Sequence, residues 1–503
     1  MAAYCADPPD DPFAVSRSMF DALAGELAGP AASGLTAFEL EELLDESGRE
    51  VIRQLLQDHL DLRAAREEQQ AREQRAPAAG PDGITRTRLE TGHGRLLSTL
   101  FGTVTVTRCA WRAPGAPNYR PADAALSLPA GRHSRSLAKL AATEAARGSF
   151  DAAHAAIARR CGNVIGKRQL EQSVTAAAAD IPAFYAARVP EPCAPETLLV
   201  LSADGIVMRP GALRAATAKA AARLGKMRTR LSAGEKPNRK RMACLVTVYD
   251  AEPAERRPHD VIAPPGGRHG SRKPRPGPKA LAKWLAGSVR SDPAEVIAAA
   301  FDEAEARDPG HRRTWVVLVD GAEHQLDLIR AEAARRNAGI HVVIDLIRVL
   351  ELHLEGGLVP ARRRRPRRRG LGRRQGTRGA GRRQRPGRRG DHRPGRLRRP
   401  ARQPAPTPAS ATSAPGTSTS VMTRPSQTAG PSPPALSREP AGTSADRLDI
   451  GGARWGLDGA EAVLTLRAVI SNGDFEEYWR FHLEREHQRL YPGIKQGQYA
   501  LSA

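Results

Sequence analysis

Two short apolar runs, each followed by Asp-Gly, constrain the fold of this chain most. The first is LLVLSADG at 198–205 and the second is WVVLVDG at 315–321. Apolar runs of this length, rich in Val and Leu, are typical of strands buried in a sheet. Each run would carry one carboxylate, Asp204 or Asp320, to the end of a buried strand. Asp-Gly is also a common strand-to-turn dipeptide, so the pattern alone leaves a plain turn open at both places.

The segments around these runs predict a mixed α/β domain at 196–351. Its expected elements, in chain order, are strands at 198–208, 242–249 and 261–262, helices at 279–289 and 293–306, a strand at 315–319, a helix at 322–337 and a strand at 340–344. Three strands followed by helix, strand, helix and strand form the element order of the RNase H-like fold. Asp345 follows the last strand and is a third candidate acid, although it could equally cap a helix.

Two carboxylates at strand ends of such a sheet suit a pair of divalent cations. In nucleases these ions lie roughly 3.5–4 Å apart; one activates the attacking water or 3′-hydroxyl and the other stabilises the leaving oxygen of the phosphodiester. We therefore predict Asp204 and Asp320 as catalytic residues and metal ligands. The pattern identifies no third carboxylate.

Residues 134–180 predict three consecutive helices. They are expected at 136–146, at 150–160 after an N-cap at Ser149, and at 166–179 after a Cys-Gly-Asn break. Helix, Gly-containing turn and helix is the spacing of a helix-turn-helix. The last helix opens with Lys167, Arg168 and Gln169, where a recognition helix would meet phosphates and bases. On spacing alone, an ordinary helical hairpin is an equal alternative.

The first 190 residues divide into two predicted regions. Residues 1–95 form an N-terminal helical region, in which apolar residues recur at spacings of three and four over 36–75. An Ala/Gly/Pro linker is expected at 76–86. Residues 96–190 contain a small β unit at 96–111 and the helical DNA-binding region.

The net charge of +23 is concentrated in one block. Residues 361–402 contain 20 Arg and a single acid, Asp391, whereas the rest of the chain has 58 basic and 54 acidic residues. The wider segment 352–445 consists mainly of Arg, Pro, Gly, Ser, Thr and Ala, which cannot bury enough apolar surface to offset the entropy of ordering. We predict a long disordered Arg/Pro-rich insert. A natural basic linker and translation in the wrong frame of GC-rich DNA both explain it.

Cysteine usage and hydropathy predict a cytoplasmic protein. The five Cys are scattered without metal-ligand spacing, as expected in a reducing compartment: Cys5, Cys109, Cys161, Cys193 and Cys244. The chain does not start with a signal peptide pattern, and no run of 18 apolar residues exists. A membrane partner is therefore not expected.

Five runs of the chain carry a family resemblance. They are SADG at 202–205, VLVDGAEHQ at 317–325, IDLIRVLE at 344–351, GARWGLDGAEA at 452–462 and SNGDFEEYW at 471–479. They resemble insertion-sequence transposases of the ISKra type, bacterial DDE enzymes with an RNase H-like catalytic domain. The likeness covers roughly 35–351 and 446–495, and its most specific part is the C-terminal run.

The resemblance implies Mg²⁺-dependent (or Mn²⁺-dependent) DNA strand cleavage and transfer at the ends of an insertion sequence. Asp204 and Asp320 would be the first two metal ligands, and the helices at 134–180 would contribute to binding the terminal repeats. The resemblance also implies that 446–503 is the helical end of the catalytic domain. It places the protein at the bacterial nucleoid and leaves a homo-oligomer open.

The chain departs from this family at the third carboxylate. The family carries that acid in an Ile-Glu-Gly-type run shortly before the Gly-Ala-Arg-Trp, where this chain has the Arg/Pro-rich insert. Codons for such a run, read one base late, give the residues at 437–444. Glu439 and Glu461 lie nearby but do not match the family position. We therefore expect a defective transposase; the alternatives are a basic, non-enzymatic nucleic-acid-binding protein and another RNase H-like nuclease or resolvase.

Overall fold

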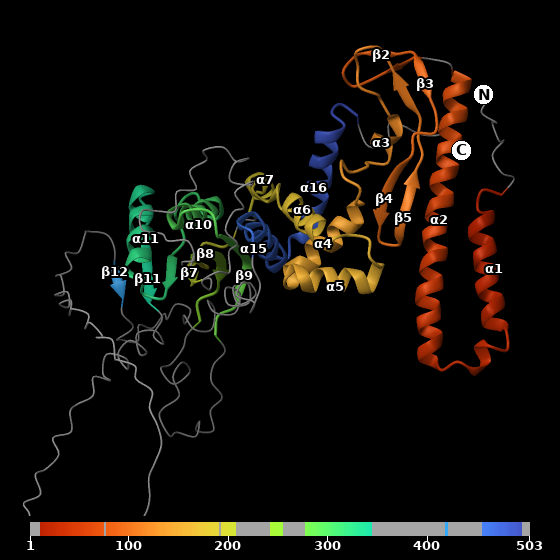
Figure 1. Ribbon diagram of the computed structural model, residues 1–503. Coiled ribbons are helices and arrows are strands. Elements are labelled where there is room, and N and C mark those ends of the chain that lie inside the picture. The colour runs from red at the N-terminus through yellow and green to blue at the C-terminus, as the bar shows by residue number, and fades with distance from the viewer. Residues whose placement is uncertain are drawn as a thin grey trace, which may run out of the picture.

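The computed structural model describes residues 11–74, 77–190, 193–207, 242–254, 277–344, 418–420 and 455–494. Within them the chain is a mixed α/β protein with a helical hairpin at one end and a mixed sheet at the other (Figure 1). Asp345, Glu439 and the edge strand expected at 261–262 lie outside the described residues. So does the predicted insert, apart from a short strand inside it.

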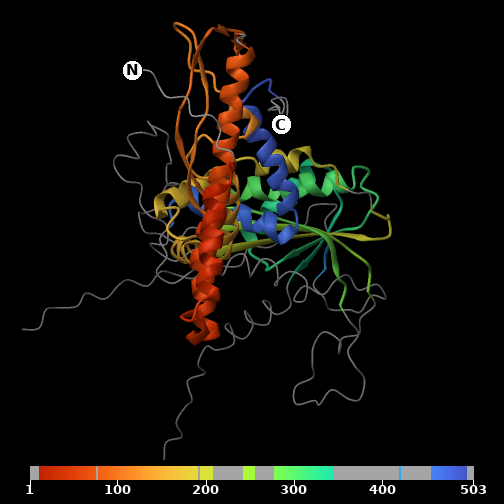
Figure 2. The same ribbon diagram turned by 90° about the vertical axis from the view of Figure 1, so that its right-hand side faces the viewer.

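The N-terminal hairpin consists of α1 (Ala14–Ala28), the 3₁₀ turn η1 (Ala32–Gly34) and α2 (Ala37–Gln74). The helix predicted at 36–75 is thus confirmed. α1 packs back along α2, and the Ser16 N–H donates to Asp58 Oδ2 at 3.0 Å (Figure 2). At 1.5 Å per residue α2 is about 57 Å long. Its second half packs on the β unit, where Leu60 is buried with Val104 and Val106.

The β unit contains three antiparallel pairs. They are β1 (Ala78–Ala79) with β2 (Thr85–Arg86), β3 (Arg88–Glu90) with β6 (Ala110–Arg112), and β4 (Arg95–Thr99) with β5 (Gly102–Val106). The β unit expected at 96–111 is confirmed. The expected linker at 76–86 is wrong in part, because β1 and β2 form a small hairpin there. Arg86 fixes it by donating to both carboxylate oxygens of Asp82.

Five helices form the middle of the molecule. They are α3 (Pro121–Ala125), α4 (Arg135–Arg147), α5 (Phe150–Cys161), α6 (Lys167–Ala177) and α7 (Ile181–Ala187). The three helices predicted within 134–180 are confirmed as α4, α5 and α6. Ser149 caps α5 as expected, since its Oγ accepts from the Ala152 N–H at 3.1 Å. Gly162, at φ 72°, ends α5 and turns the chain toward α6.

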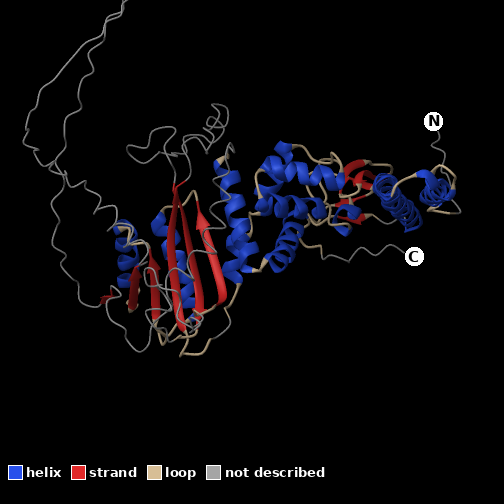
Figure 3. Ribbon diagram, turned by 90° about the horizontal axis from the view of Figure 1, so that it is seen from below, coloured by secondary structure: helices blue, strands red, loops and turns tan. Residues whose placement is uncertain are grey.

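Within the described residues, the sheet has six strands in the order β12-β11-β10-β7-β8-β9 (Figure 3). They are β7 (Leu198–Val207), β8 (Met242–Ala251), β9 (Ala280–Ser288), β10 (Trp315–Val319), β11 (Ile340–Ile344) and β12 (Ser418–Ser420). β8 is antiparallel to both β7 and β9, whereas β10 is parallel to β7 and to β11. The strands expected at 198–208, 242–249, 315–319 and 340–344 are confirmed. The two helices expected around β10 are α10 (Pro293–Arg307) and α11 (Glu323–Arg335).

The helix predicted at 279–289 is wrong, because this segment forms β9. Its sequence, ALAKWLAGS, is rich in Ala and Leu, which favour helices locally. Pairing with β8 along most of its length outweighs that preference. Gly287 fits this packing, since a Cβ at that position would come within 2.2 Å of a Leu245 methyl carbon.

Two large cores flank the sheet. On one face, α10 and α11 pack over a cluster that includes Leu201, Val246 and Val317. The second core joins α4–α7 to the C-terminal helices α15 (Leu457–Asn472) and α16 (Phe475–Leu490), and it includes Leu245 of the sheet. The C-terminal segment is thus helical as expected, and it links the sheet to the middle helices. None of the helices in the described part of the chain has the length and apolarity needed to cross a bilayer.

Candidate active site and nucleic-acid surface

Asp204 and Asp320 lie toward the same edge of the sheet on neighbouring parallel strands, Asp320 directly after β10 and Asp204 within β7, three residues before its last residue. The pairing of β7 with β10 ends at Ser202 and Leu318, so each aspartate lies two residues beyond this last pair. Strand alternation places Asp204 on the face that carries Val200, opposite to α10 and α11. In open α/β sheets, ligands bind outside the carboxyl ends of the strands. Both acids singled out in the sequence therefore lie where a ligand site is expected.

Asp320 ends β10 in a tight turn. Its Oδ1 accepts from the Ala322 N–H at 3.0 Å, and its Oδ2 makes no hydrogen bond or ion pair with the described residues. Gly321 has φ 90°, a conformation that favours glycine, and a Cβ there would lie 3.1 Å from Ile344 Cγ2 on β11. The Gly that follows the acid is thus required both by the turn and by the close approach of β11. The exposed carboxylate keeps one oxygen available to a ligand.

Asp204 lies within β7, where Leu245 is its partner on β8. Burial, together with the negative charges of Asp204 and Asp292, raises the pKa of the neighbouring Cys244 thiol to about 11. Asp292 is the N-cap of α10 at this same edge, and its side chain accepts from the Ala294 N–H. The carboxyl edge of the sheet therefore carries negative potential, which attracts cations.

The donor set at this edge fits a hard divalent cation in part. Carboxylate oxygens are the ligands that Mg²⁺ prefers in proteins. Asp204 and Asp320 supply two such groups, but among the described residues no three His, Cys, Asp or Glu side chains form a group that could hold a metal ion. The candidate acids Asp345 and Glu439 lie outside the described residues. The described chain therefore offers two of the carboxylates that a two-metal site needs.

The carboxylate of Glu461, on α15, is used in hydrogen bonds to the end of β9. Its Oε1 accepts from the Ser288 hydroxyl at 2.7 Å, and its Oε2 accepts from the Val289 N–H at 2.7 Å and the Arg290 N–H at 3.2 Å. Three donors occupy both oxygens and fasten α15 to the end of β9. Glu461 therefore positions a helix and does not complete the acid pair.

Lys167, Arg168 and Gln169 are all exposed at the start of α6, but two of them have local partners. Lys167 forms an ion pair with Asp151 in the first turn of α5. The Gln169 Oε1 accepts from the Gly166 N–H at 2.9 Å, which caps the helix. Arg168 is the member of this set without an ion pair or hydrogen bond in the described residues. Only Arg168 is thus placed as a free nucleic-acid contact.

The exposed face of α6 adds residues that the sequence analysis did not single out. Leu170 and Val174 are buried, so Arg168 and Gln172 share the opposite, exposed face. Arg159 and Arg160 are exposed at the end of α5, across the turn. We call Arg159, Arg160, Arg168 and Gln172 the α5–α6 polar face. In the sequence, this face is indicated only by the four-residue spacing of Arg168 and Gln172. That spacing can be interpreted only when the buried side of α6 is known.

The C-terminal runs that carried the family resemblance make interior contacts. Trp455 packs on Phe150 of α5, with ring centroids 5.3 Å apart. Asn472 exchanges hydrogen bonds with the backbone of Leu285, which covers the edge of β9. The Tyr478 hydroxyl donates to the Ala177 carbonyl oxygen. These residues hold the sheet against the middle helices.

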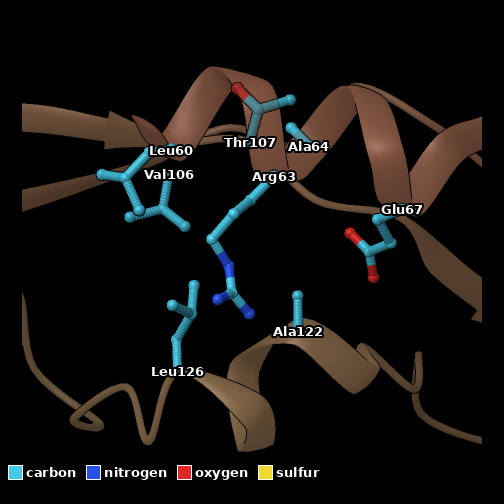
Figure 4. A pocket seen from close by; sticks show the side chains of 8 residues that line it. All are labelled: Leu60, Arg63, Ala64, Glu67, Val106, Thr107, Ala122 and Leu126. Atoms are coloured by element: carbon cyan, nitrogen blue, oxygen red, sulfur yellow. The ribbon is translucent and has the colours of Figure 1, made fainter. Parts of the chain in front are cut away.

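A small pocket lies away from this edge, between α2, β5 and α3 (Figure 4). Its lining residues are Leu60, Arg63, Ala64, Glu67, Val106, Thr107, Ala122 and Leu126. It has room for little more than a water molecule, and the Arg63 side chain extends into it. The pocket is therefore too small to be a substrate site.

Comparison of the chain with protein-family models and with curated protein sequences gives no match.

Proposed function

We propose that this protein is a DNA-processing protein of the transposase type, built on an RNase H-like sheet. The observation that carries the proposal is the arrangement of five strands, β9-β8-β7-β10-β11, with the first two pairings antiparallel and the last two parallel. This is the order expected of an RNase H-like domain. Asp204, near the carboxyl end of β7, and Asp320, directly after β10, would be the residues with which such a domain binds its divalent cations.

In this function the two aspartates would hold Mg²⁺ or Mn²⁺, which lowers the pKa of a bound water or hydroxyl and stabilises the leaving oxygen. Asp320 would bind through Oδ2, because Oδ1 is held by the Ala322 N–H. The Gly321 turn fixes the direction in which this carboxylate leaves the sheet. Asp204, on the adjacent strand, would bind from the same edge.

We further propose that catalysis in this chain is impaired and that DNA binding remains. The family resemblance places the third acid within the segment that is Arg/Pro-rich here, and Glu461 is occupied at the end of β9. Geometry and charge balance at both ions depend on every metal-binding carboxylate. The α5–α6 polar face, in contrast, is complete in the described structure and suits phosphate and base contacts.

The decisive experiment is nicking of supercoiled plasmid DNA in the presence of Mg²⁺ or Mn²⁺. It compares the chain as it stands with a version whose reading frame is restored across codons 352–445. The restored chain should nick DNA, and Asp204→Asn or Asp320→Asn should reduce its rate by at least about 100-fold, since metal ligands matter more than the outer-shell groups worth 10–100-fold. Asp292→Asn is the matched control, because Asn also caps helices and the rate should not change. Equal nicking by the Asp204→Asn variant would exclude the proposed site.

A second candidate function, nucleic-acid binding without catalysis, is favoured by the α5–α6 polar face and by the Arg-rich block at 361–402. Binding through a block of this kind is strongly salt-dependent and has little sequence preference. If the restored chain does not nick DNA, and DNA binding by the chain as it stands disappears when 361–402 is deleted, this second function replaces the first. A resolvase or nuclease unrelated to mobile elements would be supported if no inverted repeats flank the gene.

A further inference from the structure

The outer half of the α1–α2 hairpin lacks a core of its own. Among residues 11–55 only Ser16 and Ala32 are buried. Apolar side chains that would normally form a core are exposed instead, with Phe20 at 60%, Leu44 at 45% and Ile52 at 46%. Two helices alone cannot bury an apolar stripe, so stable domains add a further layer.

The exposed apolar residues of α2 form one stripe. Leu44, Gly48, Ile52, Leu55 and His59 recur at spacings of four, four, three and four, which places them on one side of the helix. The side of α2 that packs on the β unit is different, since it carries Leu56 and Leu60.

α1 adds to this surface. It runs antiparallel to α2, with Ser16 beside Asp58, so Phe20 lies at about the level of residues 51–55. We call Phe20, Leu44, Ile52 and Leu55 the hairpin stripe. It is far from the sheet, at the opposite end of the molecule (Figure 1).

We propose that the hairpin stripe binds the hairpin of a second copy of this chain, in an antiparallel arrangement that forms a four-helix bundle. Two antiparallel hairpins are the simplest units of such a bundle, and each would supply the layer that the other lacks. The proposal does not depend on the proposed catalytic function.

The charge distribution along α2 favours one direction for the second copy. The first part of the helix, 37–50, contains six acidic residues and one basic residue, Arg49. The second part, 51–74, is nearly balanced, with four Arg, His59 and five acidic residues. A two-fold axis near Ile52 brings the acidic part of each copy over the nearly balanced part of the other and sets Asp45 opposite His59. A parallel arrangement would place the two acidic parts side by side and is disfavoured by repulsion.

The exposed apolar surface is close to what a dimer requires. Val15, Phe20, Leu35, Phe38, Leu44, Ile52 and Leu55 are each exposed by a third or more. Together they offer on the order of 600 Å² of apolar surface, against about 800 Å² per partner in a standard interface. The flanking polar residues of both helices would supply the rest. Gly48, which has nothing within 4 Å of its Cβ position, lets a partner helix approach closely.

The test is the mass of the full chain in solution, measured by sedimentation equilibrium at micromolar concentration. Wild type should have twice the 54.1 kDa chain mass. The double variant Ile52→Glu/Leu55→Glu should be monomeric, with a dissociation constant at least about 100-fold higher and an unchanged far-UV circular dichroism spectrum. Leu96→Glu is the matched control, because Leu96 is 52% exposed but lies on β4, and this variant should remain dimeric. A monomeric wild type or a dimeric double variant would overturn the proposal.

A second measurement remains decisive if the double variant fails to fold. In the Ile52→Cys variant, the new thiols of the two copies would lie close together near the two-fold axis. Mild oxidation should then give a disulfide-linked dimer. Leu96→Cys should give none. Equal cross-linking of the two variants would contradict the proposed surface.

Discussion

Glu461 connects two parts of the chain that are far apart in sequence. Its carboxylate accepts hydrogen bonds from groups at the end of β9. One of these donors, the Val289 N–H, lies 172 residues earlier in the chain. Val289 is buried, so its N–H would have no solvent partner if the carboxylate were removed. The residue therefore contributes to the stability of the fold, and the acids at the strand ends are left to carry the proposed chemistry.

Glu461→Ala should lower the free energy of unfolding by about 3 kcal/mol, because hydrogen bonds to a charged group contribute about 1.5–3 kcal/mol and the carboxylate accepts three of them. Urea denaturation followed by circular dichroism measures this loss. Asp458→Ala is the control, since Asp458 lies in the same helix but pairs with Arg290 at the exposed surface. Its expected cost is at most about 1 kcal/mol. Similar losses in both variants would show that the contact to β9 contributes little.

At this scale the sequence predicted that Asp204 and Asp320 lie on neighbouring strands of one sheet, and it missed the contacts of Glu461 and Gln169. Asp204 and Asp320 can be located from the sequence because each follows an apolar run whose composition is typical of a buried strand. The hydrogen bonds of Glu461 depend on where α15 contacts β9, and no local sequence pattern predicts that tertiary contact. For the same reason Gln169 could be placed at a helix start but not assigned to its cap.

α6 is the element on which nucleic-acid binding depends in our proposal. Its buried side packs against α4 and α15, and its exposed side carries Arg168 and Gln172. Arginine and glutamine are side chains that read base edges or contact phosphates. The capping contact of Gln169 holds the first turn of this helix in place.

Arg168→Ala should weaken DNA binding by about tenfold and reduce the salt dependence by roughly one phosphate contact. Gln169→Ala should instead lower the stability of the protein by about 1 kcal/mol through loss of the cap, with a smaller effect on binding. Fluorescence anisotropy with a DNA duplex at several salt concentrations separates these effects. Lys139→Ala is the control, because Lys139 lies on α4 and pairs with Glu476. If Arg168→Ala binds DNA as wild type does, α6 is not the contact helix.

Element types were predictable wherever the local pattern and the tertiary context agree. The strands β7, β8, β10 and β11 are apolar runs, and α4, α5 and α6 have caps and breaks in the sequence. β9 was not predictable, since its Ala- and Leu-rich sequence favours a helix until β8 is beside it.

At the scale of the whole molecule, α16 holds the middle helices together through Asp180. This aspartate is buried at the start of α7, and its carboxylate lies 2.7 Å from His482 Nδ1 and accepts from Arg485 and Arg489. Burial alone would raise the pKa of Asp180, but hydrogen bonds from Arg489, His482 and Arg485 outweigh it and hold the pKa well below 3.8. Burial also lowers the pKa of His482 below 6.5.

These two pKa shifts make the protein less stable as the pH falls. The His482 ring takes up a proton more readily in the unfolded chain, so stability begins to fall as the pH drops below about 6.5. The contribution of Asp180 is fully present above its unfolded pKa near 3.8 and is lost as the pH falls from there toward the lower folded pKa. Both effects act in the same direction.

Asp180→Asn should therefore destabilise the protein by about 2 kcal/mol at neutral pH, since an amide replaces a charged acceptor of several hydrogen bonds. The difference from wild type should shrink below about pH 4, where the wild-type carboxylate becomes protonated in the unfolded chain. Urea midpoints measured between neutral and acidic pH test both statements. The control is Asp45→Asn, whose partner Arg49 lies on the same exposed helix surface, and it should change the midpoint little at any pH. A difference between Asp180→Asn and wild type that stays constant down to strongly acidic pH would mean that Asp180 does not act through its charge.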